Sequence, residues 1–405
     1  MDRPKLRKVD RYEHQRGSEA MLVVRDPLGL AEPFAIDAEF SSVLDLLDGA
    51  HTLPQVRQSL LMRHGMDLPV ADLRAFVHDL QEAGLLDDEV FRDRWADAHA
   101  DFLEATVRAP VLAGVVYPDH PGELVAALER AVPSSVARVS ADSHVAGVMV
   151  PHDPPDRAAS TQLIDRTLRD LPDPGRLEAV VVLGSDHGPG LLPYVVTAKP
   201  HRTPLGVVPT SGPIIEALER RLPWISREEI RHREAISIEI ATLYLQQIYG
   251  DGCPPIVPVL CGQTVLAPRD GEAQEAERFA AAIEALCEDR EILLWVSGEL
   301  SHGGVAYGRP PLSDDGERQL AARDRAILDV VGRADPSAVA VACATDHPQG
   351  RCSGGPPLTT AAKLLPVGFR TQVVQYDLVE APEGTDGVVG QAGLRFVAPA
   401  VTRTG

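Results

Sequence analysis

The chain has few basic residues for its length. It carries 39 Lys and Arg against 59 Asp and Glu over 405 residues, a formal net charge of -20. Nucleic acids and anionic membranes attract cationic surface, so the composition argues against both as partners. The sequence also lacks any run of about 18 apolar residues, and its first residues, MDRPKLRKVD, lack the apolar segment of a signal peptide. We therefore expect neither a membrane span nor a secretion signal.

Cysteine is scarce as well. The five cysteines are 253, 261, 287, 343 and 352, and no two form a C-x-x-C pair. A sparse, odd set of this kind is typical of a reducing compartment, so we expect a cytoplasmic protein without structural disulfides. Cys253, Cys261, Cys287 and Cys343 are expected in the core.

Residues 1–90 predict a small unit of two strands and three helices, of the winged-helix kind. The strands are expected at Met21–Val24 and Pro33–Ile36. Three stretches with helical apolar spacing follow, ending near Gly49, Gly65 and Gly84. Residues 91–106 read as a helical connector.

From residue 107 to 405, apolar strands alternate with helical stretches. This alternation predicts an α/β domain with a largely parallel sheet. In such sheets ligands bind beyond the carboxyl ends of the strands. Histidines follow three of the predicted strands, in GVMVPH (His152), VVLGSDH (His187) and SGELSH (His302). If these strands are neighbours, the imidazoles converge, and converging imidazoles favour a first-row transition metal.

Two further features bear on chemistry. Cys352 lies in a glycine-rich turn before a predicted helix at Thr359–Leu365. A helix N-terminus lowers a cysteine pKa, so a thiolate ligand or nucleophile is expected there. A hydrolase built on Ser301 or Ser297 with His302 and Glu299 is a weaker alternative, because adjacent Ser and His cannot readily pair and no G-x-S-x-G motif is present.

These motifs together resemble the Memo family, also called AmmeMemoRadiSam system protein B, which shares its fold with class III extradiol dioxygenases. The resemblance covers about residues 107–405. Its markers are VRAPVLAGVVYP, GVMVPH, VVLGSDH, HRTPLGVV, SIEI, SGELSH and the late Cys352.

The resemblance implies a redox metal held by His152, His187 and Cys352. It also implies an acid/base role for His302, with Glu299 as the acid that precedes it in the motif. Fe(II) is the expected ion, and Cu(I) is the alternative because a thiolate is a soft ligand.

The chain departs from the family pattern near this site. The usual Glu-His-Ser before SIEI reads Glu234-Ala-Ile-Ser here, so Glu234 or His232 is a candidate replacement. Asp153 begins an altered loop after His152. Asp153, Asp186, Glu234, Ser301 and His347 are therefore expected as supporting or substrate-contacting residues.

The segments LLDGAHTLPQVRQSL and FVHDLQEAGLLDD resemble PqqD-like domains, which bind the leader segment of ribosomally made precursor peptides. Joined to the metal site, this resemblance implies an oxidative enzyme that modifies a peptide or peptide-derived substrate. The alternative is a non-catalytic iron- or copper-binding protein with a peptide adaptor. A winged-helix unit that only packs on its neighbour also remains open.

Overall fold

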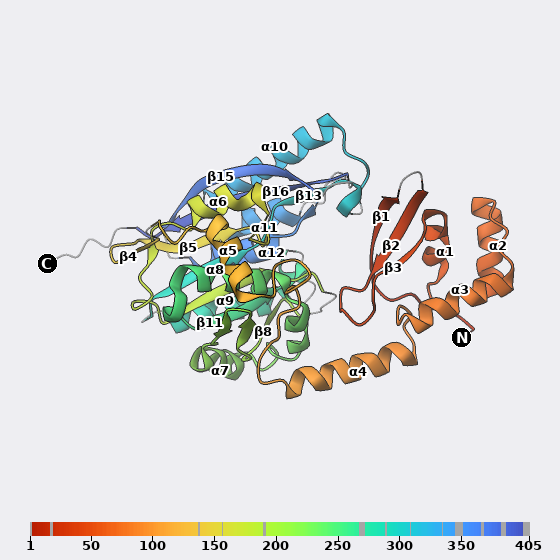
Figure 1. Ribbon diagram of the computed structural model, residues 1–405, viewed down its shortest axis with the longest axis horizontal. Helices are drawn as coiled ribbons and strands as arrows, with labels where there is room; N and C mark the ends of the chain where they lie inside the picture. The colour runs from red at the N-terminus through yellow and green to blue at the C-terminus, as the bar shows by residue number, and fades with distance from the viewer. Residues whose placement is uncertain are drawn as a thin grey trace. The chain divides into compact units, whose positions relative to one another are not determined.

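The chain forms two compact units in the computed structural model, which describes residues 2–16, 19–136, 138–155, 157–188, 192–266, 272–287, 290–307, 309–333, 335–344, 351–365, 368–381 and 386–399. The first unit spans Met1–Ala105 and the second begins at Thr106 (Figure 1). No helix in the described ranges is long and apolar enough to span a membrane.

The first unit contains an antiparallel sheet in the order β1-β2-β3, built from Asp10–Arg16, Glu19–Arg25 and Phe34–Asp37. Three helices follow: α1 (Ser41–Leu46), α2 (Leu53–His64) and α3 (Val70–Glu82). The sequence predicted β2, β3 and the three helices but missed β1. Its sequence, DRYEHQR, is polar and lacks the apolar alternation by which a strand is recognised.

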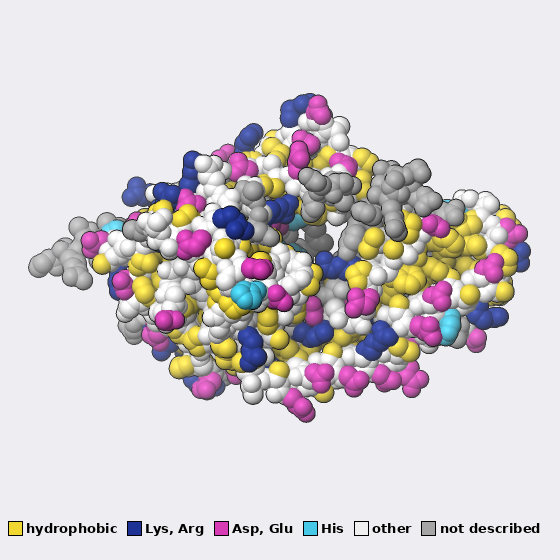
Figure 2. All heavy atoms as spheres, viewed as in Figure 1, with side chains coloured by type: hydrophobic (Ala, Val, Ile, Leu, Met, Phe, Trp, Pro, Cys, Tyr) yellow, Lys and Arg dark blue, Asp and Glu magenta, His cyan; other side chains and the backbone are white. Residues whose placement is uncertain are grey.

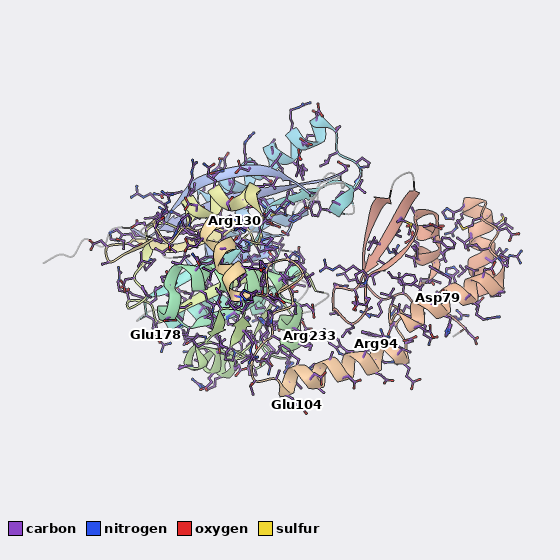
Figure 3. All side chains as sticks on the ribbon, viewed as in Figure 1. Asp79, Arg94, Glu104, Arg130, Glu178 and Arg233 are labelled. Carbon is purple, nitrogen blue, oxygen red and sulfur yellow. The ribbon has the colours of Figure 1, made fainter. Side chains whose placement is uncertain are left out.

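Helix α4 (Glu89–Glu104) occupies the predicted connector region. Arg94 ties it to the end of α3, donating hydrogen bonds to the carbonyls of Glu82 (2.7 Å) and Ala83 (2.9 Å) (Figure 3). Acidic residues recur along its exposed face at Glu89, Asp93, Asp97, Asp101 and Glu104. Acidic side chains also line the lower edge of the view in Figure 2. The acidic residues of α4 contribute to the net negative charge and give the helix a solvated face.

The second unit is built on one large sheet in the order β14-β13-β16-β5-β12-β7-β11-β8, with β15 paired to β16. Four central strands run parallel: β5 (Val145–Val150), β12 (Ile292–Ser297), β7 (Ala179–Ser185) and β11 (Ile256–Cys261). The others flank them: β13 (Ser301–Gly303), β14 (Arg351–Cys352), β15 (Arg370–Glu380), β16 (Val388–Val397) and β8 (Tyr194–Val196). The predicted α/β class with a largely parallel sheet is confirmed.

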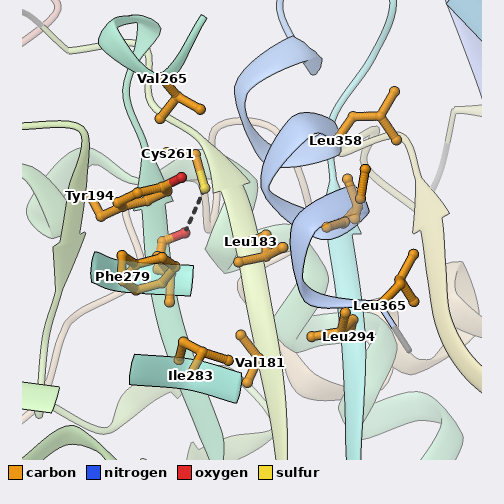
Figure 4. Packing of buried hydrophobic residues seen from close by; sticks show 14 of the residues in the cluster. Val181, Leu183, Tyr194, Cys261, Val265, Phe279, Ile283, Leu294, Leu358 and Leu365 are labelled. Carbon is orange, nitrogen blue, oxygen red and sulfur yellow. Dashed lines mark hydrogen bonds between the residues drawn. The ribbon is translucent and has the colours of Figure 1, made fainter. Parts of the chain in front are cut away.

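Helices cover both faces of this sheet, and β7 shows why. Its side chains alternate between two cores, with Val180 and Val182 in one and Val181 and Leu183 in the other. The first core is closed by α5 (Pro121–Ala131), α6 (Ala158–Thr167) and α8 (Ile236–Tyr249). The second is closed by α7 (Gly212–Arg221), α9 (Glu272–Cys287), α10 (Asp314–Val331), α11 (Pro336–Ala344) and α12 (Gly355–Leu364). Figure 4 shows Phe279 beside Tyr194, on which its ring stacks with centroids 4.0 Å apart, and Ile283 beside Val181 of β7 in the second core.

Two of the sequence markers meet in a buried ion pair. Arg108 and Glu239 are each 1% exposed, and a guanidinium nitrogen of Arg108 contacts the Glu239 carboxylate. That carboxylate also accepts hydrogen bonds from the backbone of Val111 (2.9 Å) and Leu112 (2.9 Å) and from the Tyr117 hydroxyl (2.6 Å). The VRAPVLAGVVYP and SIEI motifs therefore form one structural anchor, which fixes the chain entering the domain to α8.

Two buried histidines make this unit sensitive to acid. Burial lowers the pKa of His232 to about 3, and burial with the nearby Arg108 charge lowers the pKa of His201 well below its usual value. Since the unfolded chain binds these protons near pH 6.5 and the folded chain does not, stability is complete above pH 6.5 and falls as the pH drops toward 3.

We expect the free energy of unfolding to lose about 1.4 kcal/mol per pH unit for each of the two histidines below their unfolded pKa. Urea titrations between pH 7 and 4 measure this slope. His232→Gln, whose amide can replace the hydrogen bond to the Val195 carbonyl (3.0 Å), should show a shallower slope. His78→Gln, at a side chain 64% exposed, should leave it unchanged. An equal slope in His232→Gln and the unaltered protein would contradict the assignment.

Candidate functional site

Three neighbouring parallel strands end at the same edge of the sheet. In the pairing register, Ser297 of β12 lies between Val150 of β5 and Gly184 of β7. Each of these strands is followed within three residues by a titratable side chain: His152, Glu299 and His187. The sequence predicted that the imidazoles converge if their strands are neighbours. Strands β5 and β7, which precede His152 and His187, lie on either side of β12.

The imidazoles of His152 and His187 face each other. Their ring centroids are 5.3 Å apart, with the planes inclined at 59°. The side chain of His152 is 7% exposed, whereas His187 is exposed. Within the described part of the chain, Nδ1 of His152 is buried without a hydrogen-bond partner. Its Nε2 lies 3.7 Å from Oε2 of Glu299, beyond hydrogen-bond length.

Glu299 is a buried carboxylate beside these rings. Its Oε2 is 3.0 Å from Nε2 of His302, so the predicted acid does contact the predicted acid/base histidine. Burial alone raises the pKa of Glu299, but the charge of His152 and the hydrogen bond from His302 outweigh it and hold the pKa below its ordinary value. Conversely, burial lowers the pKa of His302, and the Glu299 hydrogen bond and charge more than reverse this, so the net pKa is raised.

Cys352 departs from expectation. It lies in the short strand β14 rather than in a free turn, and helix α12 begins only at Gly355. Its pKa is raised well above the usual value, because of a hydrogen bond with Cys343 and because of burial. The raised pKa differs from the low-pKa thiolate that the sequence suggested at this position. Cys352 and Cys343 are 1% and 4% exposed, and both lie in the apolar core.

Asp153 points back into the domain. It accepts hydrogen bonds from Arg157 (3.1 Å) and Gln391 (2.7 Å) and contacts the Ser160 hydroxyl. Burial and the nearby Glu299 charge raise its pKa. Asp153 thus supports the loop after His152 and leaves the space between the two imidazoles to other groups.

The remaining candidates are scattered. Asp186 pairs with Arg231, and Glu234 with Arg233 (3.0 Å). His232 is fully buried and lies next to His201, with ring centroids 6.5 Å apart. These contacts place neither Glu234 nor His232 in the cluster around Glu299. His347 lies outside the described residues.

Ser301 belongs to a buried network that the sequence did not reveal. Its hydroxyl donates to Oδ1 of Asp324 (2.6 Å), and the Tyr376 hydroxyl donates to Oδ2 of the same carboxylate (3.0 Å). Ser301 and Asp324 are both fully buried. The sequence does carry a sign of this network, because the acidic Asp324 lies between Leu320 and Ile327 in the apolar stripe of α10. A serine held this way on the strand is not presented to substrate, which argues against the hydrolase.

The two imidazoles suit a metal ion. Two rings that bind one ion through nitrogen at about 2.1 Å place their centroids roughly 5 Å apart, close to the separation found here. Donor atoms that share an ion lie about 3.0–3.6 Å apart, close to the 3.7 Å between His152 and Glu299. No group of three or more His, Cys, Asp or Glu residues within the described ranges is already arranged to hold a metal. The separation of the two imidazoles fits the ion that the resemblance implies.

Comparison with known proteins identifies the family to which the second unit is similar. A family model described as Memo-like protein matches residues 108–395. The chain belongs to this family. A MEMO1 family protein from Aquifex aeolicus is 24% identical over 379 residues, covering 92% of this chain and 95% of the relative. A MEMO1 family protein from Thermus thermophilus is 26% identical over 293 residues, covering 71% of this chain and 82% of the relative.

The Aquifex match also bears on the first unit. An alignment covering 92% of the chain is too long to fit within residues 106–405, so this Memo-like relative shares part of the N-terminal unit as well.

Proposed function

We propose that this Memo-like protein is a metal-dependent oxidative enzyme, with Fe(II) as its ion, that acts on a ribosomal peptide or a peptide-derived substrate. The observation that carries the proposal is the pair of facing imidazoles, His152 and His187, beside the buried Glu299. Fe(II) bound there supplies a centre at which dioxygen and an electron-rich substrate can meet.

The residues around the ion have separable tasks. His152 is held by the loop that Asp153 anchors, and its Nδ1 has no hydrogen-bond partner within the described chain. His302 keeps a proton on the nitrogen that faces Glu299, and this proton can be given to a substrate oxygen or taken from a substrate hydroxyl. A site that only stores metal has no need of such a proton donor, so this pair favours catalysis over storage.

The N-terminal unit supports a peptide as substrate. Strand β3 lies at one edge of the sheet β1-β2-β3, and among the described strands it pairs with β2 alone. An open edge can accept an extended peptide as a further strand, whose main chain supplies the hydrogen bonds. This is the way the PqqD-like resemblance would deliver a leader segment.

Oxygen uptake tests the proposal. Full-length protein purified without oxygen and loaded with Fe(II) should consume dioxygen when given short precursor peptides encoded beside its gene. His302→Gln should keep the iron yet lose at least about 100-fold in rate, the usual contribution of a general acid or base. Folded protein that holds iron but consumes no oxygen with any such peptide would favour the non-catalytic metal-binding function. Folded protein with neither iron nor copper above trace would remove the proposal altogether.

A further inference from the structure

The backbone at His187 is bracketed by the side chain of its neighbour, Asp186. Oδ1 of Asp186 accepts a hydrogen bond from the Gly188 backbone N–H (2.8 Å), which closes a turn with His187 at its centre. The His187 side chain is exposed, whereas that of His152 is 7% exposed. The orientation of the His187 ring therefore depends on how firmly its backbone is held.

Arg231 contacts both ends of the segment that runs from Asp186 to Leu192. Its guanidinium pairs with the Asp186 carboxylate, and the two side chains are 5% and 4% exposed. Its Nη1 donates hydrogen bonds to the Leu192 carbonyl (3.2 Å) and to Oε2 of Glu228 (2.6 Å). The same Glu228 oxygen accepts from the Leu192 N–H (3.3 Å). Arg231 and Glu228 thus hold both backbone groups of Leu192, and Arg231 also holds Asp186.

The 3-10 helix that carries Arg231, η2 (Glu229–Glu234), is fixed to the domain on two sides. The Arg108 side chain donates from Nε to the carbonyl of His232 (3.0 Å). The His232 ring is hydrogen-bonded to the Val195 carbonyl of β8 (3.0 Å). Arg231 therefore reaches its partners from a backbone that is itself tied to the core.

The space around the guanidinium is limited by Gly262, which follows β11. A Cβ added there would lie 2.9 Å from the Leu192 carbonyl oxygen and 3.3 Å from Nη2 of Arg231. The Gly262 N–H donates to the Pro193 carbonyl (2.9 Å). Glycine is needed for this close approach, which leaves the guanidinium little room to take another position.

We propose that Arg231 is a positioning residue, which holds His187 so that its imidazole faces His152. Arg231 fastens both ends of the segment that carries His187, and the Asp186 carboxylate links the guanidinium to the His187 backbone. Two rings that serve one site must each be held to within about 0.5 Å of the productive geometry. This inference rests on the metal site of the proposed function and names what maintains its geometry.

The charges in the cluster agree with such a role. Two carboxylates, Asp186 and Glu228, surround the single guanidinium of Arg231. The cluster therefore adds no net positive charge beside the imidazoles, so it does not oppose the binding of a cation there. What Arg231 contributes is the joining of three separate groups, which a planar guanidinium with five N–H donors can do.

Hydrogen exchange of the metal-free, full-length protein tests whether Arg231 holds this segment. Arg231→Lys keeps the positive charge, but its compact ammonium cannot contact all three partners at once. Peptides that contain His187 should exchange at least about tenfold faster than in the unaltered protein, because local opening of the segment becomes easier. Mass spectrometry of the exchanged peptides measures the rates, and circular dichroism confirms folding.

Arg138→Lys is the matched control. Arg138 is also buried, and it also joins a carboxylate, that of Asp165, to backbone carbonyls, including that of Leu168 (3.1 Å). This substitution should leave exchange around His187 unchanged. If Arg231→Lys does not fold, Gly262→Ala serves in its place, because the added methyl group displaces the Leu192 carbonyl and the guanidinium together.

A second measurement shows whether Arg231 acts through His187. Arg231→Lys should lower Fe(II) affinity by about 10–100-fold, the usual cost of losing a residue that orients a ligand. The same substitution should lower the affinity no further in His187→Ala, but should still lower it in His152→Ala. A residue that only stabilises the fold would have equal effects in the two backgrounds.

The outcomes separate this inference from the proposed function. Unchanged exchange around His187 in folded Arg231→Lys would overturn the inference. Equal losses of Fe(II) affinity in the His187→Ala and His152→Ala backgrounds would overturn it as well. If the folded, unaltered protein binds no Fe(II), the proposed function fails, and hydrogen exchange of the metal-free protein still decides whether Arg231 holds His187.

Discussion

Replacing Glu239 with Gln should cost about 3–5 kcal/mol of unfolding free energy, the usual effect of leaving one member of a buried ion pair alone. Arg108 is 1% exposed and would keep its charge without a counter-ion. The Glu239 oxygens accept hydrogen bonds from two backbone N–H groups and from the Tyr117 hydroxyl. The NH2 group of the new glutamine would face some of these donors and could not accept from them. Urea unfolding at pH 7.5 measures the loss.

A surface pair provides the matched control. Glu216 and Arg220 lie 3.9 Å apart on α7, with side chains about 70% exposed. Glu216→Gln removes the same charge from a solvated pair and should change stability by less than about 1 kcal/mol. Equal effects of the two substitutions would show that Glu239 does not anchor the start of the domain.

His152→Ala and His187→Ala should each lower Fe(II) affinity by more than about 100-fold, since each removes a ligand rather than an outer contact. Neither change should unfold the protein, because His187 is exposed and His152 Nδ1 makes no hydrogen bond among the described residues. Metal analysis after anaerobic gel filtration, with a chelator competition for affinity, measures the effect.

His201→Gln is a useful comparison for this pair. His201 is buried too, and it lies in the other histidine pair, near His232. The His201→Gln protein should keep its iron even if its free energy of unfolding falls. Full iron content in His152→Ala or His187→Ala would show that the imidazole pair does not bind the iron.

The sequence predicted most of the second unit because its central strands are continuous apolar runs, such as the AVVVLGS of β7. The placement of His152, Glu299 and His187 after such strands was also readable. The sequence did not show whether these strands are neighbours, because strand order depends on how the intervening helices cross over. The structure supplies that step by setting β12 between β5 and β7.

The misses have physical causes. Helix α11, PSAVAVACA, is apolar all round, so it shows no helical stripe to recognise. Cys352 was expected in a turn because of its distance to a helix start, but it lies in a short strand paired with Ser301, a long-range contact. Asp324 reads as one more acid of α10 until its buried partners, Ser301 and Tyr376, are known.

The central claim is that one metal ion sits between the two imidazoles at the strand ends. Anomalous diffraction at the iron edge, from crystals grown anaerobically with Fe(II), tests it most directly. We expect a single strong peak within about 2.0–2.3 Å of a ring nitrogen of both His152 and His187. Crystals saturated with Fe(II) that show no peak there, or a peak bound to Cys352 and Cys343 instead, would contradict it.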